Sequence, residues 1–410
     1  MAENTAQTDE HEPIIGFMMK LAVAMQRYGA PAHKLEDLTH YVSNRLGIKG
    51  NIFAMNTVLM AAFGDLFSQK VIMHSAMSSG EINLDKQVRL YRVANDVVEG
   101  KTDFAQGERI IDQIVSAPPP YGSVMTTVCS ALSSAAAARF FGGGWREIVV
   151  AGIGGVLIGV LGTMLSTSLD RLRAFEVVGS ILVSILAAFG ALLLGPLNTT
   201  ITVLGGLVFL LPGFTVTVAM NELASRHMIS GTSRLMGAIT VLLVMGLGVT
   251  LGQNLASIMH VEISHDISIP LAPWTEWVAL IVGLSSYVVL FKVPRSEAPY
   301  VIGAGVITYL VAWGASKQVD VDMATGCAAF SLGIMGNLYA RFLGKPSAIP
   351  TVPGIMYLVP GSIGMKSLFQ MIDRNTINAI EMAFQMSVLA MAIVTGLLLA
   401  NVVIPPRRML

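Results

Sequence analysis

The chain has 410 residues, of which 53% are hydrophobic and only 13% charged, and its mean hydropathy is +0.66. An ordinary soluble domain carries about 25% charged residues, so this composition excludes a soluble globule and indicates an integral membrane protein. The net charge is zero and no basic run occurs, which excludes nucleic acid as a partner.

The two cysteines, Cys129 and Cys327, each lie in an apolar stretch without a Cys or His cluster nearby. Their number and spacing exclude a disulfide framework and a thiolate metal site. The spacing motifs of nucleophilic hydrolases and zinc peptidases are also missing from the sequence. We therefore predict no metal ion, no cofactor and no catalytic residue.

The first 120 residues differ in composition from the rest of the chain. They hold 25 of the 52 Lys, Arg, Asp and Glu residues, and residues 1–13 lack the pattern of a secretory signal. We predict a small cytoplasmic α+β domain over residues 1–120, ended by three prolines at 118–120. Its expected elements are helices at 14–28 and 32–46, strands within 48–64 and at 70–75 with a turn at 65–69, and helices at 83–99 and 103–115.

Ten apolar stretches follow, each close to the roughly 20 residues that a membrane-spanning helix requires. The sequence therefore predicts a polytopic α-helical membrane protein with about ten transmembrane helices. The first five stretches are 122–141, 147–168, 174–195, 199–219 and 234–256, and the second five are 273–291, 297–315, 321–343, 350–369 and 379–403.

The two sets of five stretches match each other. Pro212-Gly213 in the fourth stretch and Pro360-Gly361 in the ninth lie 148 residues apart, and the same offset relates the second, third and fifth stretches to their counterparts. Because each set has an odd number of crossings, the second set must be inverted relative to the first. We predict two inverted five-helix repeats, over 121–260 and 261–410. The alternative is a chance recurrence of Pro-Gly.

The distribution of basic residues favours an orientation with both termini in the cytoplasm. Under that orientation ten basic residues lie in inner loops and four in outer loops. The inner ones are Arg171, Arg173, Arg226, Arg234, Lys292, Arg295, Arg341, Lys345, Arg407 and Arg408, and the outer ones are Arg139, Arg146, Lys317 and Arg374.

The paired Pro-Gly sequences are the strongest indication of a functional site. Proline removes a backbone donor, so each pair is expected to break its helix and leave free N–H and C=O groups at membrane depth. Such half-helix ends favour a substrate carboxylate. The alternative is a kink that serves packing. The residues expected to bind substrate are Pro212, Gly213, Asn221, Glu222, Pro360, Gly361, Lys366, Thr199 and Thr200.

Carboxylates at membrane depth are candidates for proton coupling, because burial favours their protonated form. Glu222 lies ten residues after Pro212, and Gln370 occupies the equivalent position after Pro360. Glu176 and Glu381 lie near the starts of two other spans. The alternative for each is a helix-end residue whose charge reaches the membrane surface.

Several segments resemble motifs of the threonine/serine exporter family. The family's N-terminal signature is similar to Arg27-Tyr28-Gly29-Ala30 followed by His33-Lys34-Leu35-Glu36, and its fourth-span motif to Leu211-Pro212-Gly213 with Glu222. The second half resembles, at Val359-Pro360-Gly361-Ser362, a partner that is a separate chain in some bacteria. Lys34 replaces the usual Arg, and Glu222 the usual Asp.

The resemblance implies a secondary transporter in the inner membrane that exports threonine and serine, driven by the proton motive force. Its partners would be the small-molecule substrate, protons and the lipid bilayer, and a homo-oligomer is compatible with the sequence. Because split-chain relatives resemble dicarboxylate exporters, export of a C4 dicarboxylate such as succinate is the alternative. A membrane-anchored hydrolase is a third hypothesis, which the missing nucleophile motifs disfavour. We expect Glu222 to exchange the proton.

Overall fold

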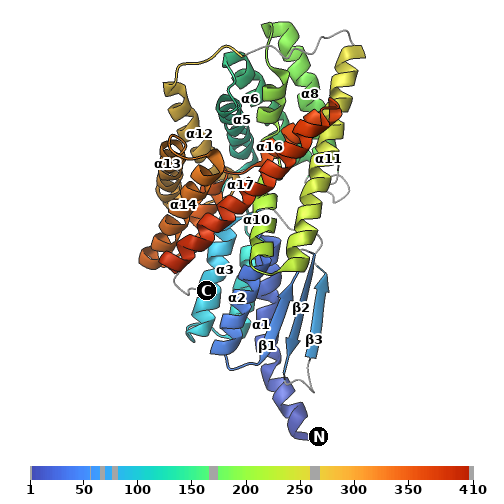
Figure 1. Ribbon diagram of the computed structural model, residues 1–410. Helices are drawn as coiled ribbons and strands as arrows, with labels where there is room; N and C mark the ends of the chain where they lie inside the picture. Colours follow the sequence, from blue (N-terminus) through green and yellow to red (C-terminus); the bar gives the residue numbers. More distant parts are fainter. Residues whose placement is uncertain are drawn as a thin grey trace.

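The computed structural model describes residues 2–55, 57–64, 70–75, 82–165, 174–258 and 268–405, with side chains from residue 12 onward. The first helices and the strands lie at one end of the molecule, and the helices from α5 onward form the remainder (Figure 1). The expected turn at 65–69 and the basic residues Arg171, Arg173, Arg407 and Arg408 fall outside the described residues.

The N-terminal unit combines four helices with a three-stranded antiparallel sheet of order β1-β2-β3. The helix and strand order is the one expected, with the stretch 48–64 divided into β1 and β2. Asn83 caps α3 by accepting a hydrogen bond from the Lys86 N–H, and Asp103 caps α4 in the same way. The elements are α1 Ala2–Arg27, α2 Ala32–Arg45, β1 Gly50–Ala54, β2 Val58–Phe63, β3 Lys70–Ser75, α3 Leu84–Val98 and α4 Phe104–Ser116.

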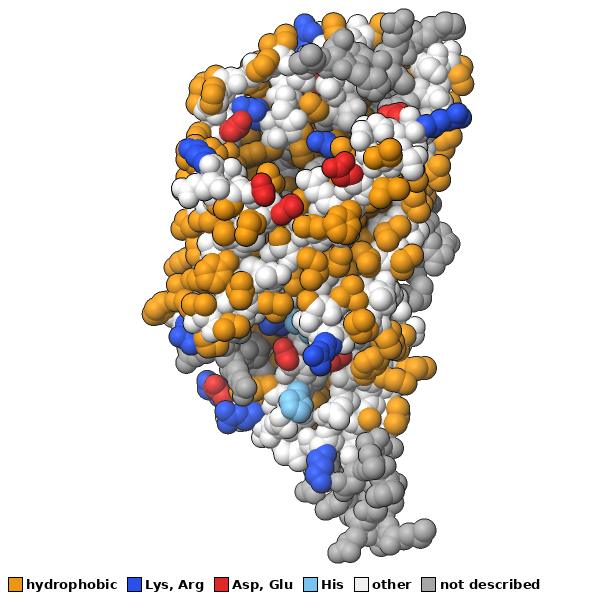
Figure 2. All heavy atoms as spheres, in the orientation of Figure 1, with side chains coloured by type: hydrophobic (Ala, Val, Ile, Leu, Met, Phe, Trp, Pro, Cys, Tyr) orange, Lys and Arg blue, Asp and Glu red, His pale blue; other side chains and the backbone are white. Residues whose placement is uncertain are grey.

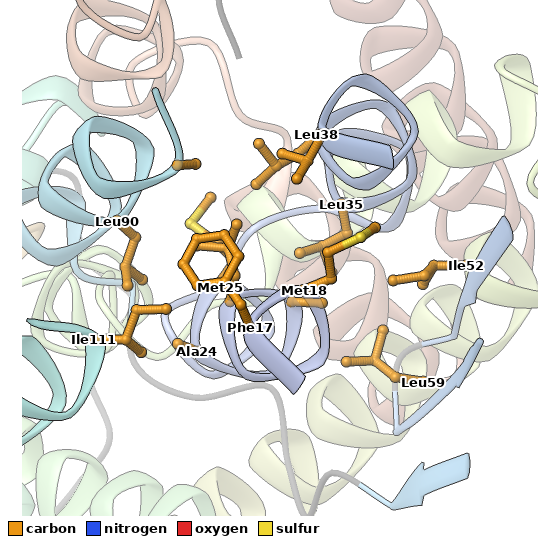
Figure 3. Close-up of a cluster of buried hydrophobic side chains, with 14 of the residues drawn as sticks. Phe17, Met18, Ala24, Met25, Leu35, Leu38, Ile52, Leu59, Leu90 and Ile111 are labelled. Atoms are coloured by element: carbon orange, nitrogen blue, oxygen red, sulfur yellow. The ribbon is translucent and has the colours of Figure 1, made fainter. Parts of the chain in front are cut away.

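The core of the N-terminal unit lies between the helices and one face of the sheet (Figure 3). Phe17 and Met25 on α1, Leu35 on α2, Leu59 on β2 and Leu90 on α3 are almost fully buried. Strand alternation explains the sheet's contribution, because Leu59 and Ala61 point inward while Met60 between them stays exposed. The core residues of this unit all come from residues 15–114.

The helices after residue 120 are apolar over most of their surface. Five of the described helices are long and apolar enough to cross a membrane: Trp145–Leu165, Phe175–Leu194, Met228–Ile258, Arg295–Ala315 and Thr376–Val403. On the face drawn in Figure 2, hydrophobic side chains form a broad band across the middle, with most charged side chains above and below it. This distribution is that of a polytopic membrane protein.

Two sets of helices follow one another in corresponding order. The first set is α5 Ser123–Phe140, α6 Trp145–Leu165, α8 Phe175–Leu194, α9 Thr199–Gly206, α10 Gly213–Ala224 and α11 Met228–Ile258. The second is α12 Trp274–Leu290, α13 Ala298–Ala315 (preceded by the 3-10 turn η1, Arg295–Glu297), α14 Val321–Leu343, α15 Ala348–Ile355, α16 Gly361–Ile372 and α17 Thr376–Val403. In each set the fourth stretch is two short helices.

Candidate functional site

Both Pro-Gly pairs interrupt their helices. α9 ends at Gly206 and α10 begins at Gly213, with Pro212 as its N-cap. α15 ends at Ile355 and α16 begins at Gly361, with Pro360 as its N-cap. Proline cannot donate to the preceding turn, which explains why a new helix starts at the following residue.

The two breaks meet in space. A Cβ atom added to Gly361 would lie 3.0 Å from both the backbone N and the Cα of Gly213, and one added to Gly213 would lie 2.7 Å from the Gly361 N. Only residues without a side chain allow two backbones to approach so closely. The two glycines therefore allow the N-termini of α10 and α16 to lie side by side, although 148 residues separate them.

A cavity of about 270 Å³ adjoins this meeting point. Its wall contains no Asp, Glu, Lys or Arg among the described residues and is rich in aromatic rings. The Phe140 ring lies edge-on to Tyr309, with centroids 5.8 Å apart, and to Tyr357, with centroids 5.1 Å apart. The lining residues are Ser133, Ala136, Ala137, Phe140, Phe141, Val208, Leu211, Tyr287, Tyr309, Met356, Tyr357, Val359, Gly361 and Ser362.

The second break contributes polar groups to the cavity wall through Tyr357, Gly361 and Ser362. Gly361 and Ser362 open α16, and the first N–H groups of a helix lack intrahelical acceptors. Together with the helix dipole they favour a negatively charged group there. The Tyr357 hydroxyl donates a hydrogen bond to the Leu280 carbonyl oxygen, 3.1 Å away. This bond holds the Tyr357 ring in the cavity wall.

The structure brings some predicted site residues to the cavity and not others. Gly361 lines it, and the half-buried Lys366 has its Nζ 5.9 Å from the ring centroid of the lining residue Phe141. Thr199 and Thr200 open α9, where Asn198 caps the helix, and neither lines the cavity. Glu381 is exposed on α17, and Glu176 lies in the first turn of α8.

Glu222 lies at the far end of α10, against the N-terminal unit. Its side chain is 0% exposed and forms a bidentate ion pair with Arg234. The Arg234 Nε lies 3.0 Å from Oε2 of Glu222, and the Arg234 Nη2 lies 3.1 Å from its Oε1. Its oxygens also accept hydrogen bonds from the Ser230 hydroxyl at 2.9 Å and from the Ala32 backbone N–H, at the start of α2, at 3.1 Å. Four donor groups thus contact the carboxylate, and the one from Ala32 attaches α2 to α10.

Two further contacts join the same surfaces. The Glu36 carboxylate lies 2.9 Å from the His227 Nε2, and the Asn221 amide lies 3.4 Å from the His33 Nε2. Burial lowers the pKa of His33 to about 3, with smaller electrostatic contributions from the neighbouring basic side chains of Lys34, His227 and Arg234. His33 is therefore neutral at physiological pH.

Sequence reasoning missed the aromatic wall and the polar group behind it. Tyr309 donates its hydroxyl to the Glu276 carboxylate at 3.3 Å, and Glu276 also pairs with Arg139 at 3.0 Å. Tyrosines in apolar stretches carry no spacing signal, because the wall is assembled from α5, α12, α13 and the two breaks. No group of three or more potential metal ligands occurs among the described residues.

Two family models match the chain. "Putative threonine/serine exporter" matches residues 16–256, and "Threonine/Serine exporter, ThrE" matches residues 276–403. The boundary between the matches falls between α11 and α12, where the second set of helices begins.

Curated relatives include proteins named "Pheromone-regulated membrane protein 10" from several organisms. The one from Saccharomyces cerevisiae (strain YJM789) is 27% identical over 361 residues, which cover 86% of this chain and 46% of the relative. Those from Candida glabrata and Eremothecium gossypii are 27% and 26% identical and cover 89% and 86% of this chain. The chain spans about half the length of these relatives. No solved structure matches it.

Proposed function

Because the chain belongs to the threonine/serine exporter family, we propose that it is a secondary transporter that exports threonine and serine across the inner membrane, driven by the proton motive force. The observation that carries this function is the contact between Gly213 and Gly361 beside the cavity. Paired broken helices at a repeat interface are a recurrent substrate site of secondary transporters.

The proposed substrate position follows from the cavity's chemistry. The carboxylate lies at the start of α16, near Gly361 and Ser362, with the Lys366 ammonium on the same helix as a nearby cation. The substrate ammonium faces the rings of Phe140 and Tyr309, since aromatic faces attract cations. A dicarboxylate would bring a second negative charge into a wall without a cationic side chain, so a small amino acid fits better.

The proposed architecture has ten membrane crossings in two inverted sets, over 121–260 and 261–410, with residues 1–120 and both termini in the cytoplasm. The corresponding order of α5–α11 and α12–α17 supports it, with a broken fourth stretch in each set. The two sets would rock about the cavity to open it to either side. Homo-oligomer formation stays a prediction.

Proton coupling through Glu222, Glu176 or Glu381 also stays a prediction. Protonation of Glu222 would have to displace Arg234, because both guanidinium contacts depend on the ionised carboxylate. It would also weaken the attachment of α2 to α10. Glu222 is therefore placed to link the N-terminal unit to the first broken helix, whether or not it carries the proton.

The test is efflux from proteoliposomes loaded in parallel with labelled threonine and labelled succinate, with and without an imposed proton gradient. Gradient-dependent threonine efflux is expected. Efflux of succinate alone would reassign the substrate to the dicarboxylates. If neither leaves the vesicles, transport of both is contradicted, and hydrolase activity of the N-terminal unit becomes the hypothesis to test.

A further inference from the structure

We propose that Glu276, on α12, is the carboxylate that couples proton movement to transport, acting on the cavity through the Tyr309 hydroxyl. This role rests on the proposed transport function. None of the three carboxylates expected from the sequence lines the cavity: Glu222 contacts the N-terminal unit, Glu381 is exposed, and Glu176 lies in the first turn of α8.

The contacts of Glu276 place it directly behind the cavity wall. Its Oε2 accepts the hydrogen bond from the Tyr309 hydroxyl at 3.3 Å, and Tyr309 lines the cavity. Among the acidic side chains that the structure describes, Glu276 alone has a recorded hydrogen bond to a lining residue. Its side chain is 40% exposed, because it lies in the first turn of α12 at the end of an apolar segment. One carboxylate is thus partly exposed outside the helix bundle and hydrogen-bonded to a residue of the cavity wall.

Protonation of Glu276 would change the charge of its ion pair with Arg139. Its Oε1 pairs with the Arg139 guanidinium at 3.0 Å, and Arg139, which is only 9% exposed, also donates to Thr275. Arg139 on α5 and Tyr309 on α13 are the ionisable side chains recorded in contact with Glu276 from the neighbouring helices. Taking up a proton at Oε2 turns the carboxylate into a neutral carboxyl group and leaves the Arg139 charge without its partner.

Glu276 also joins the two sets of helices. Arg139 ends α5, the first helix of the first set, while Glu276 opens α12, the first helix of the second. α5 begins beside the N-terminal unit, so its 18 residues place Arg139 about 25 Å farther along the molecule. A charge change at this point alters a contact between the two sets on the side away from the N-terminal unit.

Competition between proton and substrate gives the coupling its direction. In an exporter driven by inward proton flow, the transport site must bind either a substrate molecule or a proton, but not both at the same time. The ionised Glu276 favours a substrate ammonium group in the cavity, and its protonation removes that attraction. Tyr309 transmits the change in the charge of Glu276 to the cavity, because the hydrogen bond from its hydroxyl to Glu276 weakens when Glu276 becomes neutral.

The test compares two activities of the full chain in proteoliposomes. Net efflux of labelled threonine driven by a proton gradient requires coupling, whereas threonine exchange without a gradient requires only binding and rocking. Glu276→Gln is expected to lose net gradient-driven efflux and keep exchange, and its exchange should become independent of pH. Asp320→Asn, which changes an exposed carboxylate between α13 and α14, is the matched control and should keep both activities.

Gradient-driven net efflux by Glu276→Gln at the wild-type rate would overturn the role of Glu276. If Glu276→Gln loses both activities, Tyr309→Phe decides, because it keeps the ring and the Arg139–Glu276 pair and removes only the hydroxyl. If Tyr309→Phe keeps the wild-type ratio of net efflux to exchange, the proposed role of Glu276 is overturned. A ratio below that of wild type would support it. Wild-type protein that shows neither activity with threonine contradicts the proposed function instead.

Discussion

Gly213 and Gly361 lie backbone to backbone, with a Cβ built on Gly361 only 3.0 Å from the Gly213 N and Cα. Each glycine is the first residue of a half-helix that follows a proline, so the contact joins the two helix N-termini of the candidate site. The lining residues Leu211 and Val359 immediately precede the two prolines, and the cavity therefore depends on this contact.

Substituting either glycine should destabilise the fold. In Gly213→Ala, the added methyl group would overlap the Val359 side chain and the Gly361 backbone, and overpacking of this kind costs about 1–3 kcal/mol. Gly237→Ala on α11 is the control, because nothing lies within 4 Å of its added Cβ. It should be neutral or slightly stabilising, as for Gly→Ala in a helix. Thermal unfolding in detergent measures both, and equal melting temperatures would contradict the close contact.

Glu222→Gln should loosen the N-terminal unit from α10. The amide oxygen still accepts one hydrogen bond, but the ion pair is lost and Arg234 remains mostly buried without its carboxylate. Removing one partner of a buried pair costs about 3–5 kcal/mol. The measurement is limited proteolysis between residues 116 and 123, where α4 leads into α5. Faster cleavage is expected, and wild-type cleavage would show that this contact does not hold the unit.

Glu108→Gln is the control for that experiment, because its contact with Lys20 is partly exposed and such pairs contribute little. If Glu222 is also the proton carrier, Glu222→Gln will lose gradient-driven threonine efflux while the protein still inserts. Efflux at the wild-type rate would exclude Glu222 from proton coupling.

His33 should make the N-terminal unit less stable in acid. Its folded-state pKa, near 3, lies below the unfolded value of about 6.5. As the pH falls through 6.5, the unfolded chain therefore takes up a proton that the folded chain does not. The His33 contribution to stability is intact above pH 6.5 and falls by up to about 1.4 kcal/mol per pH unit between 6.5 and 3.

The measurement is the melting temperature of wild type and His33→Gln at pH 7.5 and pH 5.0. The difference between the two pH values should be smaller in His33→Gln, since its amide does not titrate. An identical pH dependence in the two proteins would contradict a buried neutral His33.

Lys366 should contribute to substrate affinity through its charge. Lys366→Ala is expected to raise the KM for threonine about tenfold, equivalent to about 1.4 kcal/mol, because a cation near the substrate carboxylate is lost. Lys366→Arg should restore most of the affinity. Unchanged KM in Lys366→Ala would place the substrate carboxylate elsewhere.

The sequence predicted those features that depend on local composition. Apolar length located the helices from α5 onward, and the Pro-Gly pairs located both breaks, because proline terminates a helix wherever the fold places it. The helix expected from residue 103 is α4, and Asp103 caps it by accepting a hydrogen bond from the Gln106 N–H.

Contacts between distant residues could not be derived in this way. The Glu222–Ala32 hydrogen bond joins residues 190 positions apart, and the Arg139–Glu276 pair joins residues 137 apart. The cavity wall combines rings from α5, α12 and α13 with the second break, so none of its aromatic residues stands out within its own segment. Such a site arises from tertiary packing, and its residues do not recur at any regular spacing in the sequence.

The most direct test of the account asks whether substrate occupies the cavity at the two breaks. Ser362→Cys places a thiol in the cavity wall, in a chain whose Cys129 and Cys327 are replaced by serine. Threonine at about ten times its Kd should slow the reaction of this thiol with a methanethiosulfonate reagent about tenfold. Ser316→Cys, exposed at the end of α13, should react at the same rate with and without threonine. An unchanged rate for Ser362→Cys in the presence of threonine would contradict the account.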